Sequence, residues 1–157
     1  MNCWHMNEHE SVAMWDRYGR SHMGLAIRST VQRLIEALEG APQNVFLASV
    51  QYIDYDTTPM SVDNALTPLI HKRMSFAFEQ ELRALAMFPE PTEPMFDLIN
   101  NPIGMLVPVD VPHLFEAIYV APGAPSWFFD TVKQSVAASV GKHILVRQSR
   151  LGEDPLF

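Results

Sequence analysis

The chain has 157 residues, of which 48% are hydrophobic and 18% charged, and its formal net charge at pH 7 is −7. This length and composition are typical of a folded domain with a buried core and exclude a disordered chain. The acidic balance argues against nucleic acid or an anionic membrane surface as the main partner. We therefore expect a single domain over residues 1–157.

The cysteine count and the first residues bear on the compartment. Cys3 is the one cysteine, so no internal disulfide can form, and the opening MNCWHMNEHE lacks the basic start and apolar core of a signal peptide. The longest apolar runs are far shorter than the ~20 residues that cross a bilayer. The sequence therefore predicts a cytoplasmic protein with no membrane partner.

The first elements are a short strand and an aromatic helix. Residues 2–6 are typical of a strand, and Asn7 with Glu10 forms a capping box that begins a helix. Trp15 and Tyr18 lie on the apolar face of that helix. Their rings either pack in the core, which is the usual role of aromatic side chains at this spacing, or stack on a ring of a ligand.

A strand and a second helix follow. Residues 25–28 read as a buried strand, Ser29 with Gln32 begins the helix, and Gly40 ends it. Its apolar positions recur at helical spacing. The residues expected to be buried are Val31, Leu34, Ile35 and Leu38.

The middle of the chain holds the strongest strand signal. Residues 44–55 include the run VFLASVQYIDY, which is apolar enough for a central strand. A helix is expected over residues 62–78, where Pro68 should kink it or split it. Residues 82–88 fit a strand or a continuing helix. The three prolines of 89–94 predict a surface loop.

The last third adds further strands and a helix. Strands are expected at 105–109, 118–120 and 144–148, and a helix should begin at Pro125 and end before Gly141. Because strands and helices alternate imperfectly, we expect an α+β fold with a central mixed sheet flanked by about four helices. The helix should bury Phe129, Val132, Val136 and Val140.

Two N-terminal histidines are candidate metal ligands. His5 and His9 are four residues apart, and Cys3 precedes them. On one helix this spacing could hold zinc, but the predicted strand–helix boundary falls between the two histidines. We therefore predict no metal site.

Residues 72–83, KRMSFAFEQELR, are the densest group of charged and aromatic side chains. On a strand, Glu79, Glu81 and Arg83 would share one face, where a carboxylate could act as a base or bind a ribose hydroxyl and Arg83 could bind an anion. On a helix, Glu79 and Arg83 would form an ion pair of a few tenths of a kcal/mol beside a buried Phe76. The sequence leaves both interpretations open.

Several blocks of the chain carry a resemblance when they are taken in order: Cys3-Trp4-His5-Met6-Asn7, Glu10-Ser11, Ala13-Met14-Trp15 with Tyr18, Gly24-Leu25-Ala26-Ile27, Lys72 with Phe76 and Glu79-x-Glu81-x-Arg83, Tyr119-Val120 with Pro122, and Asp154-Pro155-Leu156. Together they resemble bacterial domain-of-unknown-function family 2971. That resemblance implies a fold and a kinship but no activity. Members of the family carry a further segment before the first strand, so we expect a second copy to cover the corresponding face and form a homodimer.

Two functions compete. The first is a non-catalytic binding or assembly module without a cofactor, favoured because no G-x-G-x-x-G, P-loop or G-x-S-x-G motif occurs. The alternative is a nucleotide-handling enzyme, because Arg28-Ser29-Thr30 followed by Glu79-x-Glu81 is similar to the pattern of ADP-ribosyltransferases. That similarity implies NAD as cofactor and Glu81, with Glu79, as the catalytic carboxylate. The candidate ligand-binding residues are Arg83, Lys72, Trp15, Tyr18 and His5.

Overall fold

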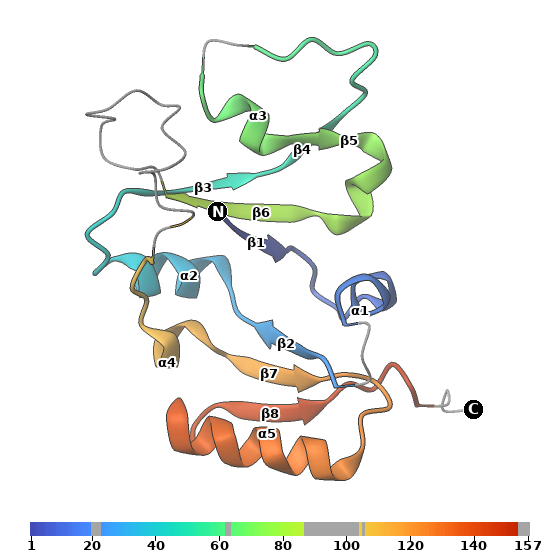
Figure 1. The fold of residues 1–157 in the computed structure, drawn as a ribbon, viewed down its shortest axis with the longest axis vertical. Helices are drawn as coiled ribbons and strands as arrows, with labels where there is room; N and C mark the ends of the chain where they lie inside the picture. The colour runs from blue at the N-terminus through green and yellow to red at the C-terminus, as the bar shows by residue number, and fades with distance from the viewer. Residues whose placement is uncertain (20–22, 62–63, 87–103, 105, 154–157) are drawn as a thin grey trace. The chain divides into compact units, whose positions relative to one another are not determined.

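The computed structural model describes residues 1–19, 23–61, 64–86, 104 and 106–153. The chain forms two compact units, each built from two segments (Figure 1): the first from Met1–Asn7 and Ala41–Val107, the second from Glu8–Gly40 and Pro108–Phe157. Helices and mixed strand pairings occur together, so the α+β class is confirmed. The expectation of a single domain stays a prediction.

A three-stranded antiparallel sheet forms the centre of the first unit. Its order is β1 (Asn2–His5), β6 (Glu81–Ala86) and β3 (Val45–Ser49). The middle strand β6 is buried on both faces. The apolar run of residues 44–55 breaks at Val50 and supplies the edge strand β3, so its expected central place was wrong.

A smaller parallel pair completes the first unit. β4 (Gln51–Ile53) pairs with β5 (His71–Arg73), and the one-turn helix α3 (Thr67–Ile70) precedes β5. Pro68 lies in the first turn of α3, where a missing N–H costs nothing. After β5 the 3₁₀ helix η1 (Met74–Glu79) leads into β6.

Two expectations for this region change accordingly. The single helix over 62–78 is wrong, because α3, β5 and η1 divide that stretch. The strand over 82–88 is confirmed as far as Ala86, and the expected loop at 89–94 lies outside the described residues.

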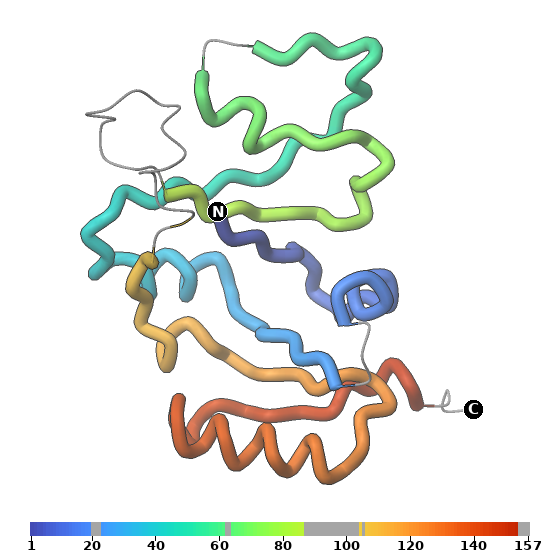
Figure 2. The backbone as a smooth tube through the Cα atoms, in the orientation of Figure 1, coloured from blue at the N-terminus to red at the C-terminus, as the bar shows by residue number. Residues whose placement is uncertain are grey.

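The second unit contains a mixed sheet covered by its longest helix. β2 (Leu25–Arg28) pairs antiparallel with β7 (Ala117–Val120), which pairs parallel with β8 (Leu145–Gln148). Helix α5 (Ser126–Ser139) runs alongside β8 (Figure 2). The fully buried core consists of Ile118, Val120, Val132, Val136 and Ile144.

The remaining helices begin at different residues from those expected. α1 (Val12–Tyr18) begins after Ser11, not Asn7, and α2 (Val31–Leu38) begins after Thr30. Ser29 does not cap α2, because its hydroxyl donates to the Leu114 carbonyl at 2.6 Å. α4 (Val111–Leu114) is capped by Asp110.

Some buried positions also differ. α2 buries Leu34 and Ala37, whereas Val31 and Ile35 are exposed. The strand expected at 105–109 is wrong, since residues 106–109 form no strand; residue 105 lies outside the described part. Among the described residues, no helix is long and apolar enough to cross a membrane.

Candidate functional site

The turn between η1 and β6 separates the two glutamates. Gln80 ends η1 with φ 39° and ψ 55°, and it is the one described non-glycine residue with a positive φ. This left-handed conformation costs about 1–2 kcal/mol for a residue with a Cβ. Hydrogen bonds from Met6 N to Gln80 O (2.9 Å) and from Gln80 N to Ala77 O (3.2 Å) hold the turn. Glu79 is therefore the last residue of η1, Gln80 is its C-cap, and Glu81 begins β6.

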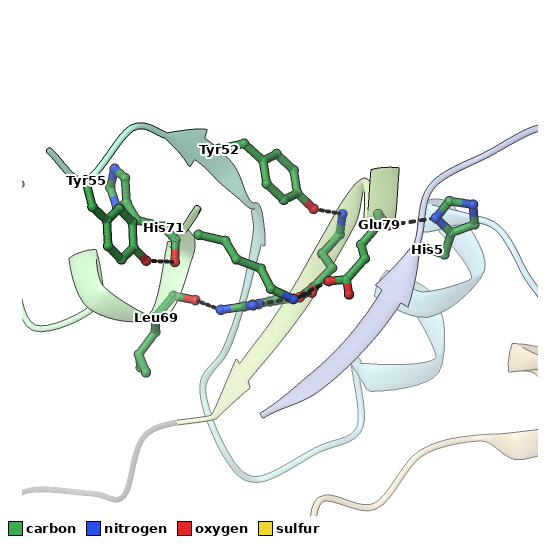
Figure 3. A network of polar contacts seen from close by, with 9 residues as sticks. His5, Tyr52, Tyr55, Leu69, His71 and Glu79 are labelled. Carbon is green, nitrogen blue, oxygen red and sulfur yellow. Dashed lines mark hydrogen bonds and ion pairs between the residues drawn. The ribbon is translucent and has the colours of Figure 1, made fainter. Parts of the chain in front are cut away.

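Four charged side chains form ion pairs beyond this turn, and Figure 3 shows the polar contacts around Glu79. Lys72 Nζ lies 2.6 Å from Glu81 Oε1 and also bonds Glu79. Arg83 Nε lies 2.7 Å from Glu81 Oε2. We call Lys72, Glu79, Glu81 and Arg83 the ion network. The strand interpretation is thus confirmed for Glu81 and Arg83, which lie two residues apart on one face of β6.

The ion network is largely removed from water. The side chains of Glu79, Glu81 and Arg83 are 1%, 9% and 10% exposed, and that of Lys72 is 23% exposed. Burying a charge costs several kcal/mol unless its partners are well placed. Here two acidic and two basic groups face one another, and Arg83 Nη1 also donates to the Leu69 carbonyl at 2.5 Å. The charges therefore compensate within the first unit.

The pKa values follow from this arrangement. Burial alone would raise the pKa of Glu81, but the hydrogen bonds from Arg83 and Lys72 outweigh it and lower that pKa to about 2. Burial would lower the pKa of Lys72, yet its bonds to Glu79 and Glu81 raise it. Glu81 is therefore a carboxylate at neutral pH and a weak proton acceptor.

Strand β1 brings two further side chains to the same face of the sheet. Cys3 and His5 are the register partners of Arg83 and Glu81. His5 Nδ1 lies 2.6 Å from the Glu79 carbonyl oxygen. Partial burial and the Glu81 charge raise the pKa of the Cys3 thiol, so Cys3 is not an activated nucleophile.

Tyr52 belongs to the site although no motif in the sequence points to it. Its hydroxyl oxygen accepts the Glu81 N–H at 2.8 Å and so fixes the first residue of β6 (Figure 3). Tyr52 sits in an apolar run 29 residues earlier in the chain. A pattern of local spacing carries no information about such a distant contact.

The structure brings together five of the seven candidate residues: Lys72, Glu79, Glu81, Arg83 and His5. The other two belong to α1 of the second unit. There Trp15 Nε1 donates to Glu10 at 3.1 Å, and the Arg17 guanidinium lies 5.9 Å from the centroid of the Tyr18 ring. Their role as ligand-binding residues stays a prediction.

The site keeps Glu81 negatively charged, and it joins the β4–β5 pair to the sheet of β1, β6 and β3. In the described ranges, no group of three or more His, Cys, Asp or Glu side chains is arranged to hold a metal ion. A comparison of the chain with models of protein families, with curated proteins and with solved structures found no match in any of the three.

Proposed function

We propose that the chain is a non-catalytic binding or assembly module, in which the ion network is a scaffold and not a reaction centre. One observation carries this proposal: both oxygens of Glu81 are occupied by cations of the same unit. A catalytic carboxylate has to turn an oxygen toward its substrate, and a general base works best with a pKa near the operating pH. Glu81 has neither property.

A thermal-shift and turnover experiment tests this function. The wild-type chain is screened against a nucleotide panel that includes NAD, since a ligand at about one hundred times its dissociation constant adds about 2.7 kcal/mol of stability. We expect stabilisation by a bound ligand without release of nicotinamide from NAD.

The matched variants are Glu81→Gln and Glu153→Gln. Glu153 forms an exposed ion pair with Arg150, so it controls for the loss of a glutamate charge. Wild-type turnover that survives Glu153→Gln and disappears in Glu81→Gln would contradict a non-catalytic role.

A second candidate is an enzyme that resembles an ADP-ribosyltransferase and uses NAD. The observation in its favour is that Glu81 keeps its charge beside the strained Gln80, and strained backbone and perturbed carboxylates concentrate at active sites. In such a reaction the ribose–nicotinamide bond breaks with its electron pair on nicotinamide, and the Glu81 carboxylate stabilises the positive charge on the sugar. The nicotinamide assay above separates the two candidates.

Assembly is the second part of the proposed module. Leu25 and Ile27 of β2 are 50% and 43% exposed, although their register partners Val120 and Ile118 are buried. An apolar sheet face that continues into solvent supports association of two copies. Sedimentation velocity at micromolar concentration tests this, and a monodisperse monomer would exclude a homodimer.

The source of the protein and its compartment are proposed from the sequence resemblance. Kinship with family 2971 favours a bacterial or mobile-element protein that works in the cytoplasm. Fractionation of bacterial cells that produce the chain tests the compartment, and recovery from the periplasmic fraction would overturn it.

A further inference from the structure

Strand β2 has an open edge in the sheet of the second unit. It pairs with β7 on one side only (Figure 1). The Gly24 and Arg28 carbonyls face β7, since each accepts a backbone N–H at 3.0 Å from a residue that flanks β7. Backbone groups alternate in direction along an antiparallel pair, so the N–H and C=O groups of Leu25 and Ile27 point away from β7. Among the residues that the structure describes, no hydrogen bond to these outward groups is found.

The open edge of β2 also lacks the usual protection against pairing. Edge strands are commonly protected by a charge, a proline or a bulge. The first three residues of β2 are apolar, Arg28 is its last residue, and its register with β7 is continuous. The side chains of Leu25 and Ile27 are 50% and 43% exposed. An apolar surface alone could fit a helix or a loop, but the outward N–H and C=O groups require an extended strand as partner.

A second copy of β2 fits this edge in one register. When two β2 strands run antiparallel with Ala26 opposite Ala26 of the second copy, Leu25 lies opposite Ile27 of the second copy. These residues then exchange both N–H···O bonds, and their side chains form one row on the face that α5 covers in each copy. A shift by one residue would set the outward groups against groups that face β7, and a shift by two would leave Leu25 or Ile27 unpaired.

The same register keeps like charges apart. Arg28 lies opposite Gly24 of the second copy, so the two arginines lie at opposite ends of the strand pair, and each has Glu116 of its own chain 3.3 Å away. We propose that two copies of the chain join edge to edge at β2, centred on Ala26, so that their two sheets form one continuous sheet. This inference rests on the proposed assembly function and specifies how the two copies meet.

The first test is a disulfide cross-link between the two copies. Cys3 is the one cysteine of the chain, so Ala26→Cys is introduced into a Cys3→Ser background. Opposite Cα atoms of a non-hydrogen-bonded pair are about 4.5 Å apart, which a disulfide can bridge. We expect Ala26→Cys to form a covalent dimer under mild oxidation, as seen by electrophoresis without reductant.

Arg28→Cys in the same background is the matched control. Residue 28 lies on the same face of β2 as Ala26 and is more exposed, so random collisions would oxidise it at least as fast. In the proposed register its Cα lies about 14 Å from that of its copy, too far for a disulfide. Equal cross-linking of the two variants overturns the inference.

The second test separates strand pairing from side-chain packing. Leu25→Ala and Leu25→Pro both lose the apolar side chain, but Leu25→Pro alone loses the outward N–H. A proline is tolerated as the first residue of an edge strand, so urea unfolding of the dissociated chains should give similar midpoints. We expect the dissociation constant of the Leu25→Pro dimer to exceed that of the Leu25→Ala dimer about tenfold or more in sedimentation equilibrium. Equal dissociation constants would overturn strand pairing.

The two tests distinguish failure of this inference from failure of the proposed assembly. A wild-type dimer with no cross-link in Ala26→Cys overturns the β2 pairing and leaves the homodimer in place. A monodisperse wild-type monomer in sedimentation velocity at micromolar concentration overturns both, and leaves the edge of β2 to a strand of a different protein.

Discussion

Lys72 and Glu81 join two sheets of the first unit. Lys72 belongs to the parallel pair β4–β5, Glu81 begins the middle strand of the antiparallel sheet, and Nζ and Oε1 are 2.6 Å apart. Since the same ammonium also bonds Glu79, one cation holds β5, η1 and β6 together. The stability of the first unit should depend strongly on this group.

The first prediction concerns the loss of that cation. Lys72→Met leaves Glu79 and Glu81 with less compensation in a buried position, and breaking a buried pair in this way costs about 3 kcal/mol or more. Urea unfolding followed by circular dichroism measures the change. Lys133→Met, at an exposed position of α5, should stay within about 0.5 kcal/mol of wild type. Equal midpoints for the two variants would show that the ion network does not stabilise the fold.

The second prediction concerns acid. Glu81 has a folded pKa of about 2, below its ordinary value of 4.5. A carboxyl group whose pKa is lower in the folded state than in the unfolded state stabilises the fold at pH values above its unfolded pKa. The stabilisation from Glu81 is therefore complete above about pH 5 and is lost as the pH falls toward 2. At about 1.4 kcal/mol per pKa unit the loss is on the order of 3 kcal/mol.

Urea midpoints at pH 6 and pH 3 measure this loss. Glu81→Gln cannot titrate, so its midpoint should fall less between the two values than that of wild type. An equal fall of the urea midpoint in the two proteins would show that groups other than Glu81 cause the acid sensitivity.

The third prediction concerns backbone strain at Gln80. Gln80→Gly removes the penalty of a Cβ at φ 39° and should stabilise the protein by about 0.5–1 kcal/mol. Gly123→Ala is the reverse control: Gly123 has φ 74° with open space around it, so only backbone strain should destabilise the variant, by about 1 kcal/mol. Differential scanning calorimetry checks both signs, and a lower melting temperature for Gln80→Gly would mean that the side chain matters more than the strain.

The fourth prediction compares two register partners. Ile118 is 5% exposed and Ile27 is 43% exposed. Ile118→Ala should cost about 2–4 kcal/mol through the cavity it leaves, while Ile27→Ala should cost less than about 1 kcal/mol in a monomer.

Ile27→Asp extends this comparison to assembly. If two copies meet at β2, the added charge should lower the sedimentation coefficient at micromolar concentration while unfolding of the dissociated chain changes little. An unchanged coefficient would place association elsewhere.

Elements with clear local boundaries could be predicted from the sequence. The bounds of β2 are confirmed, because Gly24 precedes its apolar run and helix-capping residues follow. Its expected burial is wrong, since Leu25 and Ile27 at the edge of the sheet are exposed. The expected burial of Val132 and Val136 by α5 is confirmed, and Gly141 follows the C-cap residue Val140 with a positive φ of 146°, which favours glycine.

The central strand of the first unit could not be predicted in the same way. β6 contains Glu81 and Arg83, and a strand with buried charges does not show the apolar pattern of a central strand. Their burial is possible because Lys72 of β5 and the Leu69 carbonyl of α3 supply partners from outside that sheet. The more apolar β3 therefore looked central although it lies at the edge.

The order of segments in the first unit has a consequence for synthesis on the ribosome. Asn2 of β1 pairs with Ala84 of β6, so β1 is made about 80 residues before the strand that receives it. At roughly 5–20 residues per second, β1 waits about 4–16 seconds for its partner. During that interval the nascent chain exposes Trp4 and an unpaired strand, and exposed strand edges favour aggregation.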